Sequence, residues 1–158
     1  MAEQHLPELP LLDRVKIQAE VLVPLFHACE RELGPERART LFGDTLREHF
    51  QSQVREQWNA TGHDLDTFMV DWSRRSGTSE ALTVDWKRLD PTHIDFDVTG
   101  CKYAEFWRGV GEPELGFLLQ CSADFAVTDA VDPIHLERSQ TRMQGASHCD
   151  FRFTLDRS

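Results

Sequence analysis

The spacing of the apolar residues changes once along this chain, near residue 80, and that change constrains the fold more than any other feature. Before it, apolar residues recur in steps of three and four, which is the spacing of one face of an α-helix. After it, apolar and polar residues alternate, as in a strand with one buried and one solvated face. We therefore expect an α+β fold, with an N-terminal helical layer packed on an antiparallel sheet of about four strands.

The apolar pattern of the first half predicts three helices, over residues 11–33, 35–58 and 64–75. Gly34 and Pro35 separate the first two, because glycine suits the end of a helix and proline suits its first turn. Asp64 is placed to cap the third helix and Gly77 to end it. The prolines within residues 1–10 predict a loose arm before the helical layer, which spans residues 11–77.

Residues 80–155 are expected to form two hairpins with helices inserted between them. The first hairpin alternates apolar and polar residues on both sides of Asp90-Pro91. The inserted helices cover about Cys101–Arg108 and a second segment that begins at Pro113 and contains Phe125.

The second hairpin is expected to pair Ile134–Arg142 with His148–Leu155 across a loop at Met143–Ala146. This register places Arg138 opposite Phe151, on the buried side of the sheet. A buried guanidinium is costly unless an anion meets it, so the pattern predicts a carboxylate near Arg138.

The length and net charge of the chain limit the number of domains and the kinds of molecule that it is expected to bind. A chain of 158 residues fits one domain that can bury a core without disulfides. Its net charge is −10 and its basic residues are scattered, so we expect no nucleic-acid partner, which would need a basic stripe. The first residues lack the pattern of a secretory signal, and the longest apolar stretch, Val21–Phe26, is too short to span a bilayer. We expect a cytoplasmic protein without membrane contact, and pairing with a second copy stays open.

The last third of the chain concentrates the residues that could do chemistry. Cys101 follows a glycine at the start of an expected helix, where backbone amides and the helix dipole favour a thiolate. The alternative is that Cys101 is a small apolar residue filling a corner. Cys121 and Asp124 are neighbours on one helix face, where a carboxylate could take the thiol proton or hold an attacking water. A core cysteine beside a capping aspartate is the alternative.

Cys149 and His148 are adjacent in sequence, but consecutive strand residues point to opposite faces. His148 therefore cannot activate this thiol, and Arg138 or a residue of the inserted helices is the expected partner of Cys149. His148 and Asp150 share the outer face, where they form either a catalytic pair or an ordinary solvated pair.

Cofactors are not indicated by any motif. The cysteine spacings match no paired CxxC pattern, so no metal is expected, and a dispersed zinc site built from the three cysteines and a histidine is the alternative. The chain lacks GxGxxG, GxxxxGK[ST], HExxH and GxSxG. The other histidines, His27 among them, share no ligand spacing and are expected to be ordinary surface or partly buried residues.

An ordered set of short motifs resembles the L-2-amino-thiazoline-4-carboxylic acid hydrolase family. The motifs are Cys101-x-Tyr103, Glu114-Leu115-Gly116, Cys121-x-x-Asp124, Arg138-x-x-Thr141 and Gly145-x-x-x-Cys149-Asp150-Phe151. The resemblance implies hydrolytic opening of a cyclic, amidine-like ring, as when the 2-amino-thiazoline carboxylate becomes N-carbamoyl-cysteine. The last motif is also similar to that of 4-vinyl-reductase-type small-molecule-binding domains, so a non-catalytic binding module is the alternative.

The implied reaction assigns candidate roles. The candidate catalytic residues are Cys121, Asp124, Cys101 and Cys149, and the candidate substrate-binding residues are Arg138, Tyr103, Thr141 and His148. Arg138 would hold the carboxylate of a small-molecule substrate. A thiolate of Cys121 or Cys101 would attack the ring carbon and form a covalent intermediate. Alternatively, Asp124 would activate water directly and the cysteines would only shape the pocket.

Overall fold

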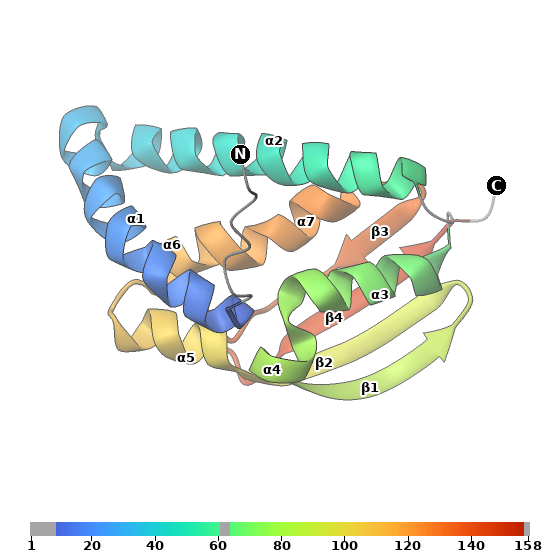
Figure 1. The fold of residues 1–158 in the computed structure, drawn as a ribbon. Coiled ribbons are helices and arrows are strands. Elements are labelled where there is room, and N and C mark those ends of the chain that lie inside the picture. Colours follow the sequence, from blue (N-terminus) through green and yellow to red (C-terminus); the bar gives the residue numbers. More distant parts are fainter. Residues whose placement is uncertain (1–8, 61–63, 157–158) are drawn as a thin grey trace, which may run out of the picture.

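The computed structural model describes residues 9–60 and 64–156, and it has the expected α+β fold (Figure 1). The helices are α1 (Leu11–Leu33), α2 (Pro35–Ala60), α3 (Leu65–Ser76), α4 (Thr78–Ala81), α5 (Lys102–Gly109), α6 (Pro113–Gly116), the π-helix η1 (Phe117–Cys121) and α7 (Ser122–Thr128). The strands are β1 (Leu82–Asp90), β2 (His93–Cys101), β3 (Ile134–Glu137) and β4 (Cys149–Leu155). They form one antiparallel sheet in the order β1-β2-β4-β3. Most of the expected arm over residues 1–10 lies outside the described residues.

The helix boundaries follow the local signals. Gly34 ends α1 with φ of 83°, and its N–H donates to the carbonyl of Glu30, while Pro35 opens α2. The Asp64 carboxylate caps α3 by accepting from the N–H of Thr67 at 2.7 Å. Gly77 ends α3 in the left-handed conformation. Helix α2 ends two residues later than expected and crosses above α7, which it contacts.

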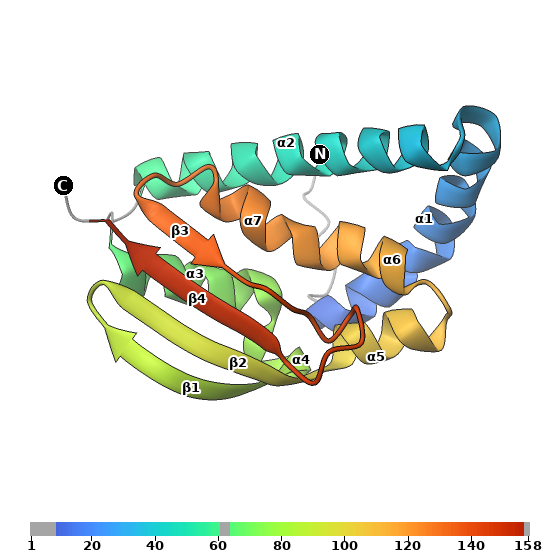
Figure 2. The same cartoon turned by 180° about the vertical axis from the view of Figure 1, so that it is seen from behind.

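Helix α3 lies on the inner face of the sheet and closes an aromatic core. The ring of Trp72 lies 5.3 Å from those of Phe96 and Phe151, measured between centroids. Phe96 and Phe151 stack at 5.0 Å across the β2–β4 pair, and Phe96 is 0% exposed. The opposite face of the sheet, seen in Figure 2, is left uncovered by the helices. The side chains there are polar, and Arg152 pairs with Asp97 at 2.8 Å.

The second hairpin has the expected register but a shorter strand. Ile134 pairs with Leu155 and Glu137 with Arg152, which is the register that sets Arg138 opposite Phe151. Strand β3 was expected to reach Arg142, yet it ends at Glu137. The next backbone N–H groups, those of Ser139 and Gln140, donate to the side-chain carboxylate of Asp150 on β4, and the β3–β4 ladder ends there.

The helix expected after Pro113 is interrupted by the π-helix η1, which the apolar spacing did not indicate. Ser122 donates its hydroxyl hydrogen bond to the carbonyl of Leu118 within this segment. The carbonyl of Cys121, at the end of η1, accepts from Arg138 at 2.8 Å. The π-helix therefore sets how α7 meets the second hairpin.

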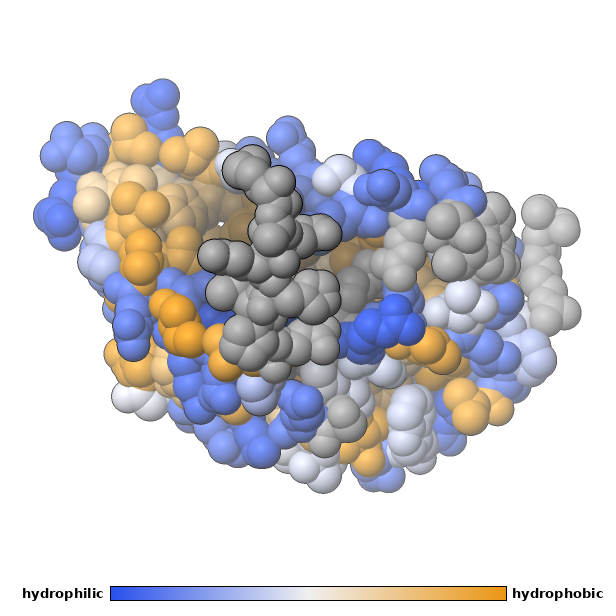
Figure 3. Space-filling view, viewed as in Figure 1, coloured by the Kyte–Doolittle hydropathy of each residue, from blue (hydrophilic) through white to orange (hydrophobic). Residues whose placement is uncertain are grey.

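Helix α1 exposes an apolar stripe made of Ile17, Val21 and Leu25, whose exposed fractions are 54%, 67% and 50%. Apolar side chains gather over α1 at the left of Figure 3. Pairing with a second copy stays a prediction.

Candidate functional site

Five of the residues singled out in the sequence come together in the interior, although they lie on separate elements. Arg138, just after β3, donates from Nη1 to Oδ2 of Asp124 on α7 at 2.6 Å. The thiol of Cys121 lies close enough to this pair, and to the thiols of Cys101 and Cys149, for each of them to influence its pKa. We call these five residues the thiol–arginine cluster.

Arg138 meets the anion that its inward position requires. Its side chain is 2% exposed, and its guanidinium lies 4.8 Å from the ring centroid of Phe125 and 5.1 Å from that of Phe151. The other carboxylate oxygen of Asp124 accepts from Nε1 of Trp72 at 3.1 Å. Both terminal nitrogens of Arg138 and both oxygens of Asp124 are thus engaged. A substrate carboxylate would have to compete with Asp124 for this guanidinium.

Burial keeps the three thiols protonated near neutral pH. It raises the pKa of Cys121 well above its ordinary value, although the Arg138 charge acts in the opposite direction. Burial also raises the pKa of Cys149, whose sulfur accepts from the N–H of Arg142 at 3.2 Å. The sulfur of Cys101 caps α5 by accepting from the N–H of Ala104 at 3.4 Å, as its place at a helix start predicts. Burial still raises the pKa of Cys101, so the thiolate favoured by the helix N-terminus is not what the structure supports.

The other three residues singled out for substrate binding lie elsewhere. Tyr103 is buried, with its hydroxyl beside Gly77, and burial raises its pKa to about 12. The hydroxyl of Thr141 donates to Oε1 of Gln144 at 3.0 Å and stabilises a turn. His148 lies on the outer face, where its Nε2 is 2.9 Å from the side-chain amide of Gln140 and 3.9 Å from a carboxylate oxygen of Asp97.

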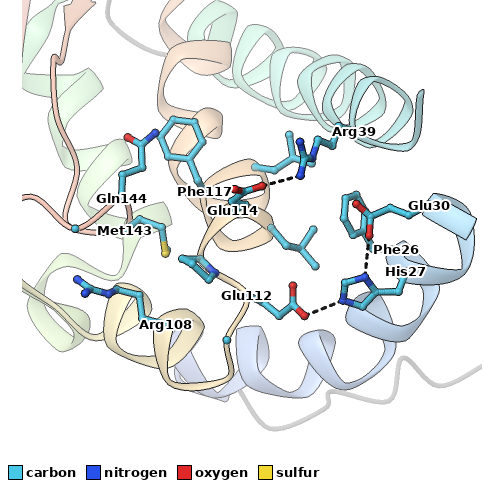
Figure 4. A pocket seen from close by; sticks show the side chains of 15 residues that line it. Phe26, His27, Glu30, Arg39, Arg108, Glu112, Glu114, Phe117, Met143 and Gln144 are labelled. Atoms are coloured by element: carbon cyan, nitrogen blue, oxygen red, sulfur yellow. Dashed lines mark hydrogen bonds and ion pairs between the residues drawn. The ribbon is translucent and has the colours of Figure 1, made fainter. Parts of the chain in front are cut away.

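An open pocket of about 990 Å³ lies between α1, α2, the α5–α6 turn and the segment 143–145 (Figure 4). We call it the rim pocket. Its apolar lining is contributed by Phe26, Leu115, Phe117, Leu118 and Met143. Its charged lining is contributed by His27, Glu30, Arg39, Arg108, Glu112 and Glu114.

Two polar contacts tie the α1–α2 pair to the Glu112-Pro113-Glu114 turn across this pocket. His27 stands between two carboxylates, with Nδ1 at 2.8 Å from Glu30 and Nε2 at 2.7 Å from Glu112. Arg39 donates from Nη2 to a carboxylate oxygen of Glu114 at 2.7 Å. These residues were missed in the sequence, where His27 and Glu112 are 85 positions apart and only the His27–Glu30 spacing is local.

Within residues 9–60 and 64–156, no group of three or more His, Cys, Asp or Glu side chains is placed to hold a metal ion. No helix there has the length and apolar character needed to cross a bilayer.

Comparisons with known proteins give a family for this chain and a solved structure with a similar fold. The sequence model of the L-2-amino-thiazoline-4-carboxylic acid hydrolase family matches residues 14–153, which includes both the thiol–arginine cluster and the rim pocket. No curated protein matches the chain. A solved structure with a similar fold is the trafficking protein particle complex subunit 3 from Naegleria fowleri, covalently bound to palmitic acid. It is 9% identical with a TM-score of 0.50, over 90% of this chain and 97% of that one, so the likeness concerns the fold alone.

Proposed function

Since the chain belongs to the L-2-amino-thiazoline-4-carboxylic acid hydrolase family, we propose that it is a cofactor-independent hydrolase that opens a small carboxylated heterocycle or a related C–N bond. The observation that carries the proposal is the rim pocket, which joins an apolar floor to charged groups of both signs. Small-molecule sites are typically concave and apolar, with a few polar groups that fix the orientation of the ligand. A ring that bears an amidine and a carboxylate needs this combination.

Arg108 is the proposed anchor for the substrate carboxylate. It lines the rim pocket and is exposed, and its Nη1 contacts only a backbone carbonyl, that of Arg142, at 3.4 Å. Within the described part of the chain no carboxylate pairs with it, whereas Arg39 pairs with Glu114. A guanidinium without a carboxylate partner can receive a substrate carboxylate through two parallel hydrogen bonds. Arg138 keeps the same proposed role only if a ligand displaces Asp124.

Replacing Arg108 with alanine should raise KM for a carboxylated substrate by about tenfold or more and leave kcat nearly unchanged, because uniform binding energy is lost. Steady-state kinetics would measure both constants. Lys102→Ala is the matched control, since it removes another exposed cation from α5 outside the pocket. An unchanged KM in the Arg108 variant would remove this residue from the site.

The protonated thiols favour attack by water over attack by a thiolate, because only the thiolate is a strong nucleophile. Alanine variants of Cys101, Cys121 and Cys149 should therefore each keep turnover within about tenfold of the parent, since acid–base and binding groups remain. Near-ultraviolet circular dichroism would verify that each variant is folded. Loss of about a thousandfold in one folded variant would instead establish the covalent thiol route.

The test of the function uses L-2-amino-thiazoline-4-carboxylate as the substrate. Ring opening adds one water, so mass spectrometry of the small-molecule fraction should detect a product that carries a free thiol. Heat-inactivated protein provides the background rate. Saturable binding of the substrate by calorimetry without any product would favour the non-catalytic binding module. If the protein neither binds this substrate nor forms a product from it, the hydrolase and the binding module are both contradicted for this substrate.

A further inference from the structure

The imidazole of His27 is held at both nitrogens by acids from two different parts of the chain. Glu30 comes from the next turn of α1, and Glu112 comes from the turn between α5 and α6. The side chains are 40% exposed for His27, 21% for Glu30 and 24% for Glu112. Figure 4 shows the ring at the pocket, with both contacts drawn. Such a ring is fixed in orientation and still open to a ligand.

We propose that His27 and Glu112 form a proton-transfer site in the rim pocket, in which Glu30 is the positioning residue for the imidazole. The inference rests on the proposed function, because proton transfer needs a reaction in this pocket. Glu30 accepts from Nδ1–H and so directs Nε2 towards the pocket, as a carboxylate orients a catalytic histidine in other sites. Nε2 and Glu112 then exchange one proton across a distance of 2.7 Å.

The proposed step balances without any further reactant. A water molecule takes the place of Glu112 at Nε2 and gives one proton to it. The water oxygen bonds to the ring carbon of the substrate, and the π electrons of the C=N bond move onto the nitrogen. The bond between that carbon and the leaving sulfur or nitrogen then breaks as the carbonyl forms. The leaving atom takes the proton back from the imidazolium, and the remaining hydroxyl proton moves to the nitrogen of the former C=N bond. No electron is gained or lost by the protein, and neutral imidazole is restored.

A purely structural role explains the arrangement less well. Ion pairs that are this exposed contribute little to the stability of a protein, so fold stability alone does not account for two acids on one ring. The position at a pocket of about 990 Å³ does account for it. The His27 imidazole lines the rim pocket, so a ligand that enters the pocket contacts it.

The charges around His27 predict the direction of the pH dependence. Hydrogen bonds to Glu112 and then to Glu30 raise its pKa above the ordinary value of 6.5, against the effect of burial. From the other walls it faces Glu114 on α6, Arg39 on α2 and Arg108 on α5. Imidazole accepts a proton only when it is neutral. We therefore expect kcat/KM to rise with pH through a value above 6.5.

The experiment compares His27→Gln, Glu112→Gln and Glu30→Gln, with Glu20→Gln as the control for an exposed acid on α1. His27→Gln should lower kcat by about a hundredfold to a thousandfold with KM and the unfolding midpoint nearly unchanged. Glu112→Gln should move the acidic limb of the pH profile to lower pH, and Glu30→Gln should move it less, as the order of their effects requires. The Glu20 variant should follow the parent.

Two readouts keep the inference separate from the proposed function. NMR titration of the His27 imidazole measures the same pKa without turnover, and it should fall in Glu112→Gln. Full activity in a folded His27→Gln variant, beside an active parent, would overturn this inference and leave the hydrolase proposal standing. A pH profile that does not move in Glu112→Gln would overturn it as well. An inactive parent protein would overturn both.

Discussion

Replacing Asp124 with alanine should lower the free energy of unfolding by about 3–5 kcal/mol, because it strands a buried charge. The guanidinium of Arg138 is 2% exposed, and Asp124 is its partner at 2.6 Å. The Nε1–H of Trp72 loses its acceptor in the same variant. Urea denaturation followed by circular dichroism would measure the loss.

The double variant Asp124→Leu with Arg138→Met should recover most of that stability, since apolar residues of similar volume often replace a buried ion pair without loss. Asp13→Ala is the control for an exposed pair, because Asp13 contacts Lys16 at 3.2 Å with both side chains nearly half exposed. It should cost about 1 kcal/mol or less. If Asp124→Ala unfolds like the parent but loses turnover, the carboxylate belongs to the chemistry, as the Cys121-x-x-Asp124 motif suggested.

Replacing Phe96 with alanine should cost about 3–5 kcal/mol, because it opens a cavity in the aromatic core. The ring is fully buried and stacks on Phe151 at 5.0 Å with an interplanar angle of 13°. Trp72 contacts it from α3, so the variant also loosens the helix from the sheet. The unfolding midpoint in urea would report the change. A matched control is Val70→Ala, whose side chain is 62% exposed on α3 and should shift the midpoint little.

The interpretation of Phe96 depends on the slope of the denaturation curve. A smaller midpoint with an unchanged slope reports lost packing, whereas a changed slope reports a less compact native state. A loss below about 1 kcal/mol would contradict the view that the Phe96–Phe151 stack is central to the core.

The fold could be predicted where the signals are local. Gly34, Pro35, Asp64 and Gly77 set helix boundaries through their own backbone preferences and caps, so the first three helices lie where the apolar spacing placed them. The register of the second hairpin followed from which residues must face inward. Arg138 could be assigned a buried anion for the same reason, since a lone inward charge is too costly to remain.

The rest depended on contacts between distant residues. Strand β3 ends early because Asp150, across the hairpin, takes the backbone N–H groups of Ser139 and Gln140. The protonation of the cysteines depends on burial, which outweighs the helix N-terminus at Cys101. The rim pocket needs His27 from the first helix and Glu112 from the middle of the chain. Neither residue stands in a recognisable motif, so their contact could not be predicted from the sequence.

The π-helix η1 makes the site sensitive to the number of residues between Pro113 and Asp124. A π-turn holds about one residue more than an α-turn, and each α-helical residue turns the chain by about 100°. Deleting a single residue from Phe117–Cys121 would let the segment rewind as an ordinary α-helix. Leu118, which lines the rim pocket, and Asp124, which neutralises Arg138, would then no longer face their present neighbours. Sequence variation within this family should therefore tolerate substitutions in η1 far better than changes in its length.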